Sequence, residues 1–407
     1  MSELKLYTAP EAITPLFPEK GEPELRELAA ALLKKSVSLT GIFNTDTRFA
    51  ISRLVEPMNS YYSNLIEGHN SHPLDIEKAL KKNYSKEPKK KMLQLESRAH
   101  VLVNHLMKQK IEETKSAYET DFICWLHGEF YKHMPEEYKV VKTKGGNNFE
   151  IIPGHLRTTE VEVGKHIAPA AKALSHFMNF FEEGYSEKNS GDALKKIIAI
   201  AASHHRLAWI HPFADGNGRV ARLFSEAALI VEKVDGAGLW SVSRGLARNN
   251  KNYYALLSNA DQDRINDFDG RGNLSDRYLF DFCKFFLETC IDQTDYMLSL
   301  LEPENLLKRV NSFVSLMVTR KALREESKYI LEEAVLKGKI MRGDMQRLTG
   351  KSENVARGIM NDMLKMELLI SESNALRSPV KINFPIRYAP YLFPKLFPGD
   401  VEATMMD

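Results

Sequence analysis

Apolar residues recur every three or four positions over long stretches of this 407-residue chain, and this spacing predicts a mainly α-helical fold. One stretch runs from Leu194 to Ala208 and should form a buried helix that ends at Pro212, because proline cannot continue a helix. The inward stripe of this helix consists of Leu194, Ile197, Ile198, Ala201, His205 and Ala208. A second helix is predicted from about Arg219 to Ile230, so residues 211–218 should form a loop between two helices.

A third amphipathic helix is predicted closer to the N-terminus, over about residues 50–68. Its apolar positions are Ile51, Leu54, Val55, Met58, Tyr62, Leu65 and Ile66. Gly68 follows the last of them, and glycine often ends a helix at its carboxyl end. The predicted organisation is therefore an N-terminal helical region over residues 1–110, which carries this helix, followed by a core over residues 111–300.

The chain changes character after about Leu301, where Lys, Arg, Met and Leu become frequent. Helical spacing is kept across a break at residues 349–352 by Met345, Leu348, Val355, Ile359, Met363 and Leu364. Ser352 is suited to cap the second of these helices. With two short strands predicted at residues 368–370 and 380–382, residues 301–407 are expected to form a winged helix-turn-helix domain and a tail.

Residues 149–164 break the helical pattern. Thr159, Val161 and Val163 alternate with other residues, which is typical of a β-strand, and a loop-like run at residues 144–148 precedes this stretch. The sequence therefore predicts a small β-hairpin within a helical core.

Composition and charge agree with a globular protein. The chain has 56 basic and 54 acidic residues, so its net charge of +2 does not favour general binding to nucleic acid or to anionic membranes. Cys124, Cys283 and Cys290 lack metal-ligand spacing and suit a reducing compartment. Residues Met1–Lys5 lack the apolar core of a signal peptide, and no stretch approaches the ~20 apolar residues of a membrane helix, so a cytoplasmic protein is expected.

The loop between the two central helices carries the most informative chemistry. From His211 to Arg222 it reads HPFADGNGRVAR. The two glycines and the asparagine readily take positive φ, so their N–H groups can converge on an anion at the positive end of the second helix. Arg219 and Arg222 lie three residues apart on the first turn of that helix, so both guanidiniums can bind phosphate oxygens.

An acid and a base complete the loop. Asp215 is a hard oxygen ligand suited to Mg²⁺ beside a phosphate, and a neutral His211 can take a proton from a hydroxyl. These are the components of phosphate-group transfer. His204 and His205 could form a zinc cluster with His211, but adjacent helical residues point about 100° apart, so core packing or hydrogen bonding is favoured.

The loop matches the motif H-P-F-x-[DE]-G-N-G-R-x-x-R at every specified position, and the chain therefore resembles the Fic family. The resemblance implies a helical nucleotidyltransferase that moves AMP from ATP onto a protein Ser, Thr or Tyr hydroxyl and releases pyrophosphate. It implies that His211 is the general base, that Asp215 binds Mg²⁺ and that Phe213 anchors the loop. It also implies phosphate contacts from Gly216, from the backbone and side-chain amide of Asn217, and from Gly218, Arg219 and Arg222.

The segment from Ser63 to Gly68 matches a second family pattern, the inhibitory motif [ST]-x-x-x-E-[GN]. The resemblance implies that Glu67 pairs with Arg222 and keeps this arginine from the γ-phosphate of ATP. A guanidinium held by a buried carboxylate cannot also hold a phosphate. The enzyme is therefore expected to rest in an autoinhibited state.

Two further sites follow from the resemblance. Residues 149–164 resemble the family's flap, which holds the target backbone as an extra strand, with Arg157 and Thr158 as target-docking residues. Tyr254 and Asp261 correspond to an aromatic and a polar residue near the adenine, although relatives often have Asn in place of Asp261.

The winged helix leaves the partners open. Its second helix mixes Lys351 and Arg357 with Glu353 and Asp362, which favours dimerisation or protein docking over DNA binding through residues 301–407. Alternative functions are a nucleotide-sensing, DNA-binding transcriptional regulator, a Fic enzyme with another donor, and an enzyme that removes AMP. The expected partners of the main reading are ATP, an unidentified target protein, the chain itself as a target, and further copies in a homo-oligomer.

Overall fold

The computed structural model describes residues 6–114, 116–142, 148–164, 166–186, 191–373, 375 and 377–406. Its α-helices are α1 Glu22–Thr40, α2 Thr45–Ile66, α3 Pro73–Leu80, α4 Pro88–Glu113, α5 Thr120–Lys132, α6 Leu174–Tyr185, α7 Ala193–Ile210, α8 Asn217–Val231, α9 Val242–Arg248, α10 Asn250–Asn259, α11 Asp276–Leu300, α12 Pro303–Thr319, α13 Ser327–Lys337, α14 Met345–Thr349, α15 Glu353–Lys365, α16 Ala389–Leu392 and α17 Gly399–Met406. Its strands are β1 Val140–Lys142, β2 Asn148–Glu150, β3 Glu162–Val163, β4 His166–Ile167, β5 Lys339–Ile340, β6 Leu369–Ser371 and β7 Val380–Ile382. The mainly helical fold is thus confirmed.

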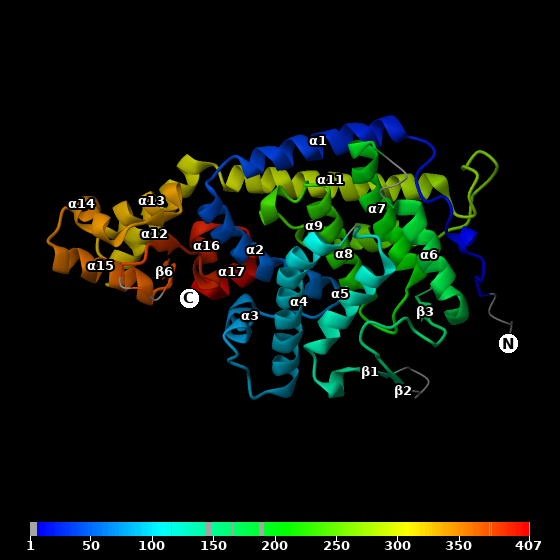
Figure 1. Ribbon diagram of the computed structural model, residues 1–407, viewed down its shortest axis with the longest axis horizontal. Helices are drawn as coiled ribbons and strands as arrows, with labels where there is room; N and C mark the ends of the chain where they lie inside the picture. Colours follow the sequence, from blue (N-terminus) through cyan, green and yellow to red (C-terminus); the bar gives the residue numbers. More distant parts are fainter. Residues whose placement is uncertain are drawn as a thin grey trace.

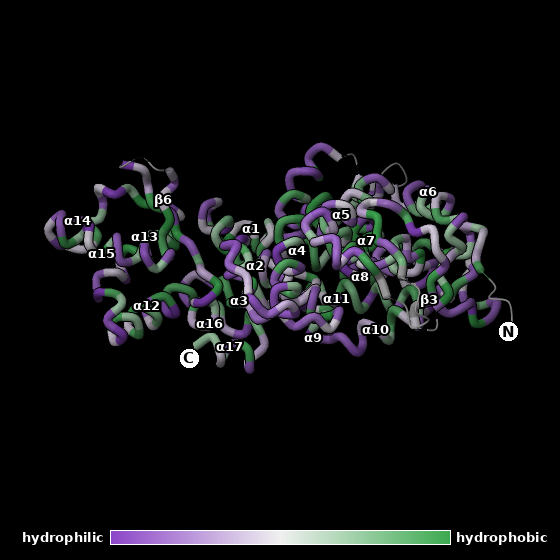
Figure 2. Tube along the Cα trace, turned by 90° about the horizontal axis from the view of Figure 1, so that it is seen from below, coloured by the Kyte–Doolittle hydropathy of each residue, from purple (hydrophilic) through white to green (hydrophobic). Residues whose placement is uncertain are grey.

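The core is built around α7. The long helices α1 and α11 lie side by side along one edge of the molecule (Figure 1), and α7 contacts both of them as well as α6 and α8. Every residue from Ile197 to Leu207 is buried, so α7 is covered on all sides and not only along the predicted stripe. Hydrophobic segments, green in Figure 2, accordingly lie near α7. This helix delivers the chain to His211 from inside the core.

Helix α2 is the helix predicted at residues 50–68, and it begins earlier than expected. The Asn44 side chain caps it by accepting a hydrogen bond from Thr47 N at 3.0 Å, and Gly68 follows its carboxyl end with a φ of 80°. The amide of Gly68 donates to the Leu65 carbonyl and the amide of His69 to the Asn64 carbonyl, which closes a Schellman turn. The turn fixes the direction in which the residues after α2 leave the helix.

The first two predicted regions share one hydrophobic core. The boundary after residue 110 falls in the last turn of α4, and α1 and α2 pack against α11 and α9 of the second region. A common cluster of buried side chains extends from Ile13 to Met405. The helix α2 is therefore packed as part of the core, with α4 on one side and α9 on another.

The region after Leu300 forms a group of helices and a small sheet at one end of the molecule (Figure 1). The helices α14 and α15 and the strands β6 and β7 lie where the sequence predicts them, and a further strand, β5, completes an antiparallel sheet in the order β5-β7-β6. Ser352 stands at the N-cap of α15 but makes no capping hydrogen bond with its side chain. The tail returns to the core, where the Tyr62 hydroxyl of α2 donates to the Leu396 carbonyl at 3.0 Å.

The predicted hairpin over residues 149–164 was wrong in its position. Two smaller antiparallel pairs form instead, β1 with β2 and β3 with β4, and residues 151–161 contain no strand. The backbone of this segment bonds to the core, because Gly154 N donates to His127 Nδ1 and Arg157 N donates to the Pro212 carbonyl, each at 2.9 Å. Most of the loop-like run at 144–148 lies outside the described residues.

None of the helices in the described part of the chain is long and apolar enough to cross a membrane.

Candidate active site

His211 lies at the point where α7 ends. Its φ of 51° and ψ of 60° place it in the left-handed region, which is uncommon for a residue other than glycine and stops the helix one residue before Pro212. The conformation is held on both sides, since His211 N donates to the Leu207 carbonyl at 3.2 Å and the His211 carbonyl accepts from Arg157 Nε at 2.8 Å. Burial lowers the pKa of His211 to about 4, so the imidazole is neutral at physiological pH and can accept a proton.

The loop after His211 is fastened by its own side chains. The amide of Asn217 accepts from Phe213 N at 2.9 Å through Oδ1 and donates to the Phe213 carbonyl at 2.8 Å through Nδ2. In this structure the amide oxygen and one N–H of the amide nitrogen thus bind the loop backbone, and the contribution of this amide to a phosphate cradle stays a prediction. Phe213 is fully buried and stacks on the ring of His127, with centroids 4.0 Å apart. It anchors the loop as expected.

The amino end of α8 opens toward the site. The helix begins at Asn217 rather than at Arg219, and Gly216 precedes it with a φ of 78° and no side-chain cap. The first amides of α8 therefore lack helical partners and can face an anion. A Cβ on Gly218 would lie 2.3 Å from Glu67 Oε1, so glycine is required here while Glu67 occupies this position.

Asp215 faces the solvent beside this helix end. Its side chain is 50% exposed, and its Oδ2 accepts from the Tyr131 hydroxyl at 2.8 Å. Arg219 Nη2 lies 3.5 Å from the same oxygen. A positioned, accessible carboxylate next to an anion site fits the oxygen ligands that Mg²⁺ prefers.

Glu67 occupies the anion site in this structure. Its Oε1 lies 2.6 Å from Arg222 Nη2, and the guanidinium is almost fully buried. Ser63 completes the contact, because its hydroxyl accepts from Arg222 Nε at 2.9 Å and its carbonyl from Nη2 at 3.0 Å. Burial acts to raise the pKa of Glu67, but Arg222, Arg219 and His69 together outweigh it and the pKa is lowered, so the carboxylate is ionised.

The other motif arginine is paired as well. Arg219 Nη1 donates to Oε1 of Glu96, a residue of α4 that is 2% exposed, and the guanidinium lies over the ring of Phe130 at 5.0 Å. The second carboxylate oxygen of Glu96 is 2.7 Å from Nδ1 of His69. Neither sequence motif includes Glu96, Tyr131 or His69, and their spacing in the chain gives no signal that they meet.

His204 and His205 form hydrogen bonds inside the core. Nδ1 of His204 is 2.7 Å from the Ser225 hydroxyl, and its Nε2 is 2.8 Å from the hydroxyl of Tyr253. Since Ser225 donates to the Ala221 carbonyl, it accepts from Nδ1, and the Tyr253 hydroxyl donates to Nε2. Burial lowers the pKa of His204 to about 3, so the ring is neutral.

The two residues expected at the adenine contact different helices. Tyr254 is 44% exposed, and its hydroxyl donates to the Ile66 carbonyl at the end of α2, at 3.0 Å. Asp261 lies beyond the end of α10, where its Oδ1 is 3.1 Å from Nε2 of His205. Tyr254 thus contacts the end of α2, whereas Asp261 contacts α7.

The two expected target-docking residues differ in their exposure to solvent. Thr158 is exposed, but the Arg157 side chain is buried and its guanidinium donates to the carbonyls of His211, Thr159 and Pro169. The buried Arg157 side chain therefore does not fit a docking residue, and it instead fixes the backbone at His211. A pocket of about 230 Å³ lies beside this segment and reaches Ala214 of the loop.

A left-handed histidine, an open helix end and two arginines thus meet in one helical site, whose positive groups suit an anion and whose neutral imidazole can accept a proton. Residues 117–229, from just before α5 to near the end of α8, match the Fic/DOC family model.

Sequence relatives match a limited part of the chain. The protein adenylyltransferase Fic of Nematostella vectensis is 40% identical over 85 residues, which are 21% of this chain and 20% of the relative. The protein of the same name in Drosophila yakuba is 34% identical over 115 residues, or 28% of this chain and 22% of the relative. The chain thus spans about one fifth of the length of these curated relatives.

Solved structures share the fold over a longer part. A Fic family protein from Desulfovibrio desulfuricans G20 has a TM-score of 0.51 at 15% identity, covering 88% of this chain and 96% of that one. A Fic domain containing signaling protein from Bacteroides thetaiotaomicron VPI-5482 has a TM-score of 0.50 at 18% identity, covering 68% and 98%.

Proposed function

We propose that this chain is a protein adenylyltransferase, a nucleotidyltransferase that moves AMP from ATP onto a protein hydroxyl and is autoinhibited by Glu67. The observation that carries the proposal is the meeting of His211, the open end of α8 and two buried arginines on the first turns of α8. The names of the sequence relatives support the same reaction.

In the proposed reaction the target hydroxyl oxygen attacks the α-phosphorus of ATP. A new P–O bond to the target forms as the bond between the α-phosphorus and the bridging oxygen breaks, and pyrophosphate leaves. The neutral His211 takes the hydroxyl proton. Arg157 holds the His211 backbone through its carbonyl, so the base keeps its place while the proton moves.

The first amides of α8 and the guanidiniums of Arg219 and Arg222 would bind the phosphates, where their positive charge meets the charge of the leaving pyrophosphate. Asp215 would hold Mg²⁺, which when bound neutralises phosphate charge.

Autoinhibition follows from competition for one guanidinium. The Glu67 carboxylate lies against Gly218 and Arg222, where a phosphate would meet the same groups. Triphosphate binding in the productive position therefore requires Glu67 to leave, and with it the carboxyl end of α2. We expect the chain to label itself or a target only weakly while this contact is intact.

The test compares the wild-type chain with Glu67→Gly and His211→Ala after incubation with Mg²⁺ and ATP labelled at the α- or the γ-phosphate. Label from the α-position alone, strongest in Glu67→Gly and absent in His211→Ala, is the expected result. Glu113→Gly is the matched control, since this carboxylate is 72% exposed at the end of another helix. Label that is the same in all four chains would contradict the proposal.

The proposal includes several finer assignments. The acceptor is an unidentified target or the chain itself, Tyr254 and Asp261 bind the adenine, Thr158 contacts the target, and the chain forms a homo-oligomer in the cytoplasm. A winged-helix role for residues 301–407 in dimerisation or docking is part of it. DNA binding, another donor and removal of AMP remain alternatives. Donor competition tests the second, and a target that already carries AMP tests the third.

A further inference from the structure

Both arginines of the loop are bound by carboxylates, and the two carboxylates come from different helices. Glu67 at the end of α2 binds Arg222, and Glu96 in the middle of α4 binds Arg219. The inhibitory motif accounts for the first pair only. The second pair withholds the other guanidinium that the proposed function assigns to phosphate.

Glu96 is placed to hold Arg219 firmly. Its side chain is 3% exposed and that of Arg219 is 9% exposed, so water does not screen the pair. Both carboxylate oxygens are occupied, Oε1 by Arg219 and Oε2 by Nδ1 of His69. A phosphate that approaches Arg219 must either displace Glu96 or lie beside a buried negative charge.

His69 joins this second pair to the first one. It stands two residues after Glu67, in the Schellman turn that Gly68 closes, and its amide donates to the Asn64 carbonyl at 2.9 Å. Since an ionised carboxylate only accepts hydrogen bonds, His69 donates from Nδ1 to Oε2 of Glu96. The turn after α2 therefore contacts α8 through Glu67 and α4 through His69.

We propose that Glu96 is a second inhibitory residue of the same site, which withholds Arg219 from the nucleotide phosphates as Glu67 withholds Arg222. His69 links Glu96 to the inhibitory turn, so the two carboxylates restrain one segment together. This inference rests on the proposed function, because it assumes that Arg219 binds phosphate.

The opposite role for Glu96 makes the opposite prediction. If the carboxylate positioned Arg219 for phosphate, its removal would weaken ATP binding, because the guanidinium would lose its orientation. If it inhibits, its removal strengthens ATP binding. Adenosine has no phosphate, so its affinity should be the same with and without the Glu96 carboxylate.

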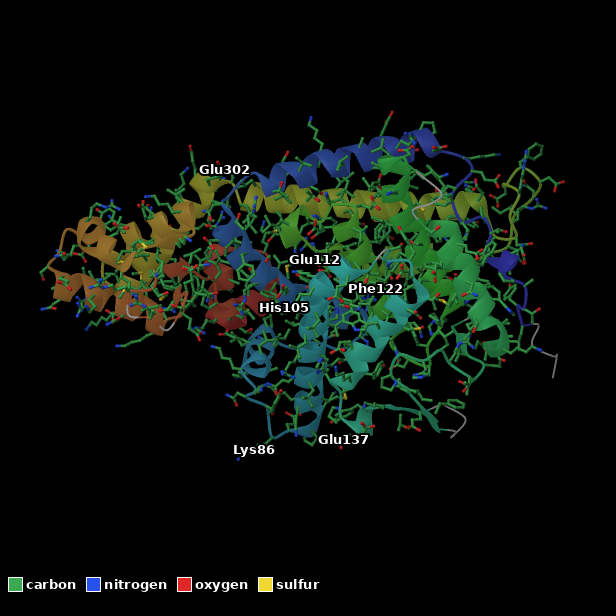
Figure 3. All side chains as sticks on the ribbon, in the orientation of Figure 1. Lys86, His105, Glu112, Phe122, Glu137 and Glu302 are labelled. Atoms are coloured by element: carbon green, nitrogen blue, oxygen red, sulfur yellow. The ribbon has the colours of Figure 1, made fainter. Side chains whose placement is uncertain are left out.

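The test measures the affinity of the full chain for ATP with Mg²⁺, and for adenosine, by titration calorimetry in Glu67→Gly and in Glu67→Gly with Glu96→Gln. Glutamine keeps the shape of Glu96 but removes its charge. We expect ATP affinity to rise roughly tenfold, the value of a hydrogen bond to a charged group, with adenosine affinity unchanged. Glu112→Gln is the control, because Glu112 is exposed on the same helix (Figure 3). Equal or weaker ATP binding in the double variant would overturn the proposal.

A second variant tests the link without touching either carboxylate. His69→Asn leaves the Glu96–Arg219 pair in place but is too short to reach Glu96, so in the otherwise unchanged chain ATP should bind several-fold more tightly. Unchanged ATP affinity would refute the link. Both tests measure ATP binding, so they test the roles of Glu96 and His69 even if no α-label is transferred. Absence of label transfer would instead contradict the proposed adenylyltransferase activity.

Discussion

Acidification should destabilise this protein, because several of its histidines are buried as neutral imidazoles. His100, His127 and His204 are at most 1% exposed. Burial lowers their pKa values to about 3, about 4 and about 3. In the unfolded chain a histidine titrates near ~6.5, so below that pH the unfolded state binds more protons than the folded one.

The sign and size follow from these pKa values. Stability is unaffected above the unfolded pKa and falls as the pH drops from about 6.5 toward the folded values. At pH 5 each of the three rings costs about 2 kcal/mol, or roughly 6 kcal/mol together. That sum is comparable with the ~5–15 kcal/mol by which a typical domain is stable.

Proton uptake on unfolding measures the effect directly. The chain is unfolded with denaturant in unbuffered solution at pH 5, and the acid needed to hold the pH is titrated for the wild type and for His100→Leu. Leucine cannot be protonated, so the variant should take up about one proton fewer per chain. His105→Leu is the control, because this ring is exposed on the same helix (Figure 3). A difference well below one proton for His100→Leu would refute the reasoning.

Two predictions concern the site. Ser63→Ala removes the acceptor of Arg222 Nε, and an unsatisfied buried donor costs about 1–3 kcal/mol. Self-labelling should therefore rise roughly tenfold above that of the wild type yet stay below that of Glu67→Gly. No rise would mean that Ser63 does not hold Arg222. Arg157→Lys is made in the Glu67→Gly chain, and lysine cannot reproduce the three hydrogen bonds from Arg157 to carbonyls. The turnover rate should therefore fall by about tenfold or more while the KM for ATP changes little. A raised KM with an unchanged turnover rate would contradict the anchoring role of Arg157.

Local pattern was enough to predict the central helices and the loop between them. The spacing around Leu194 and Ile230 gave both helices, and Gly68 ended α2 as predicted, because these features depend on residues close together in the chain. The start of α8 was missed by two residues, since Gly216 already supplies the left-handed turn before it.

The errors arose where tertiary contacts override local pattern. Alternation at Thr159 and Val161 predicted a strand. The backbone of this segment instead donates hydrogen bonds to His127 and Pro212 of the core, and it does not pair as a strand. Arg157 was predicted to dock the target, since nothing near it in sequence shows that three carbonyls converge on its guanidinium.

The Glu67–Arg222 and Glu96–Arg219 contacts differ in how far the sequence alone could predict them. The Glu67–Arg222 contact joins residues 155 positions apart, and it could be expected only because each partner belongs to a recognisable motif. The Glu96–Arg219 contact joins residues 123 positions apart and has one partner without a motif, so only the packing of α4 against α8 reveals it. Both guanidiniums are paired with carboxylates in this structure. On the proposed function, nucleotide binding would therefore exchange carboxylate for phosphate at two positions, and the strength of the restraint would be set by α2 and α4 as much as by the loop after α7.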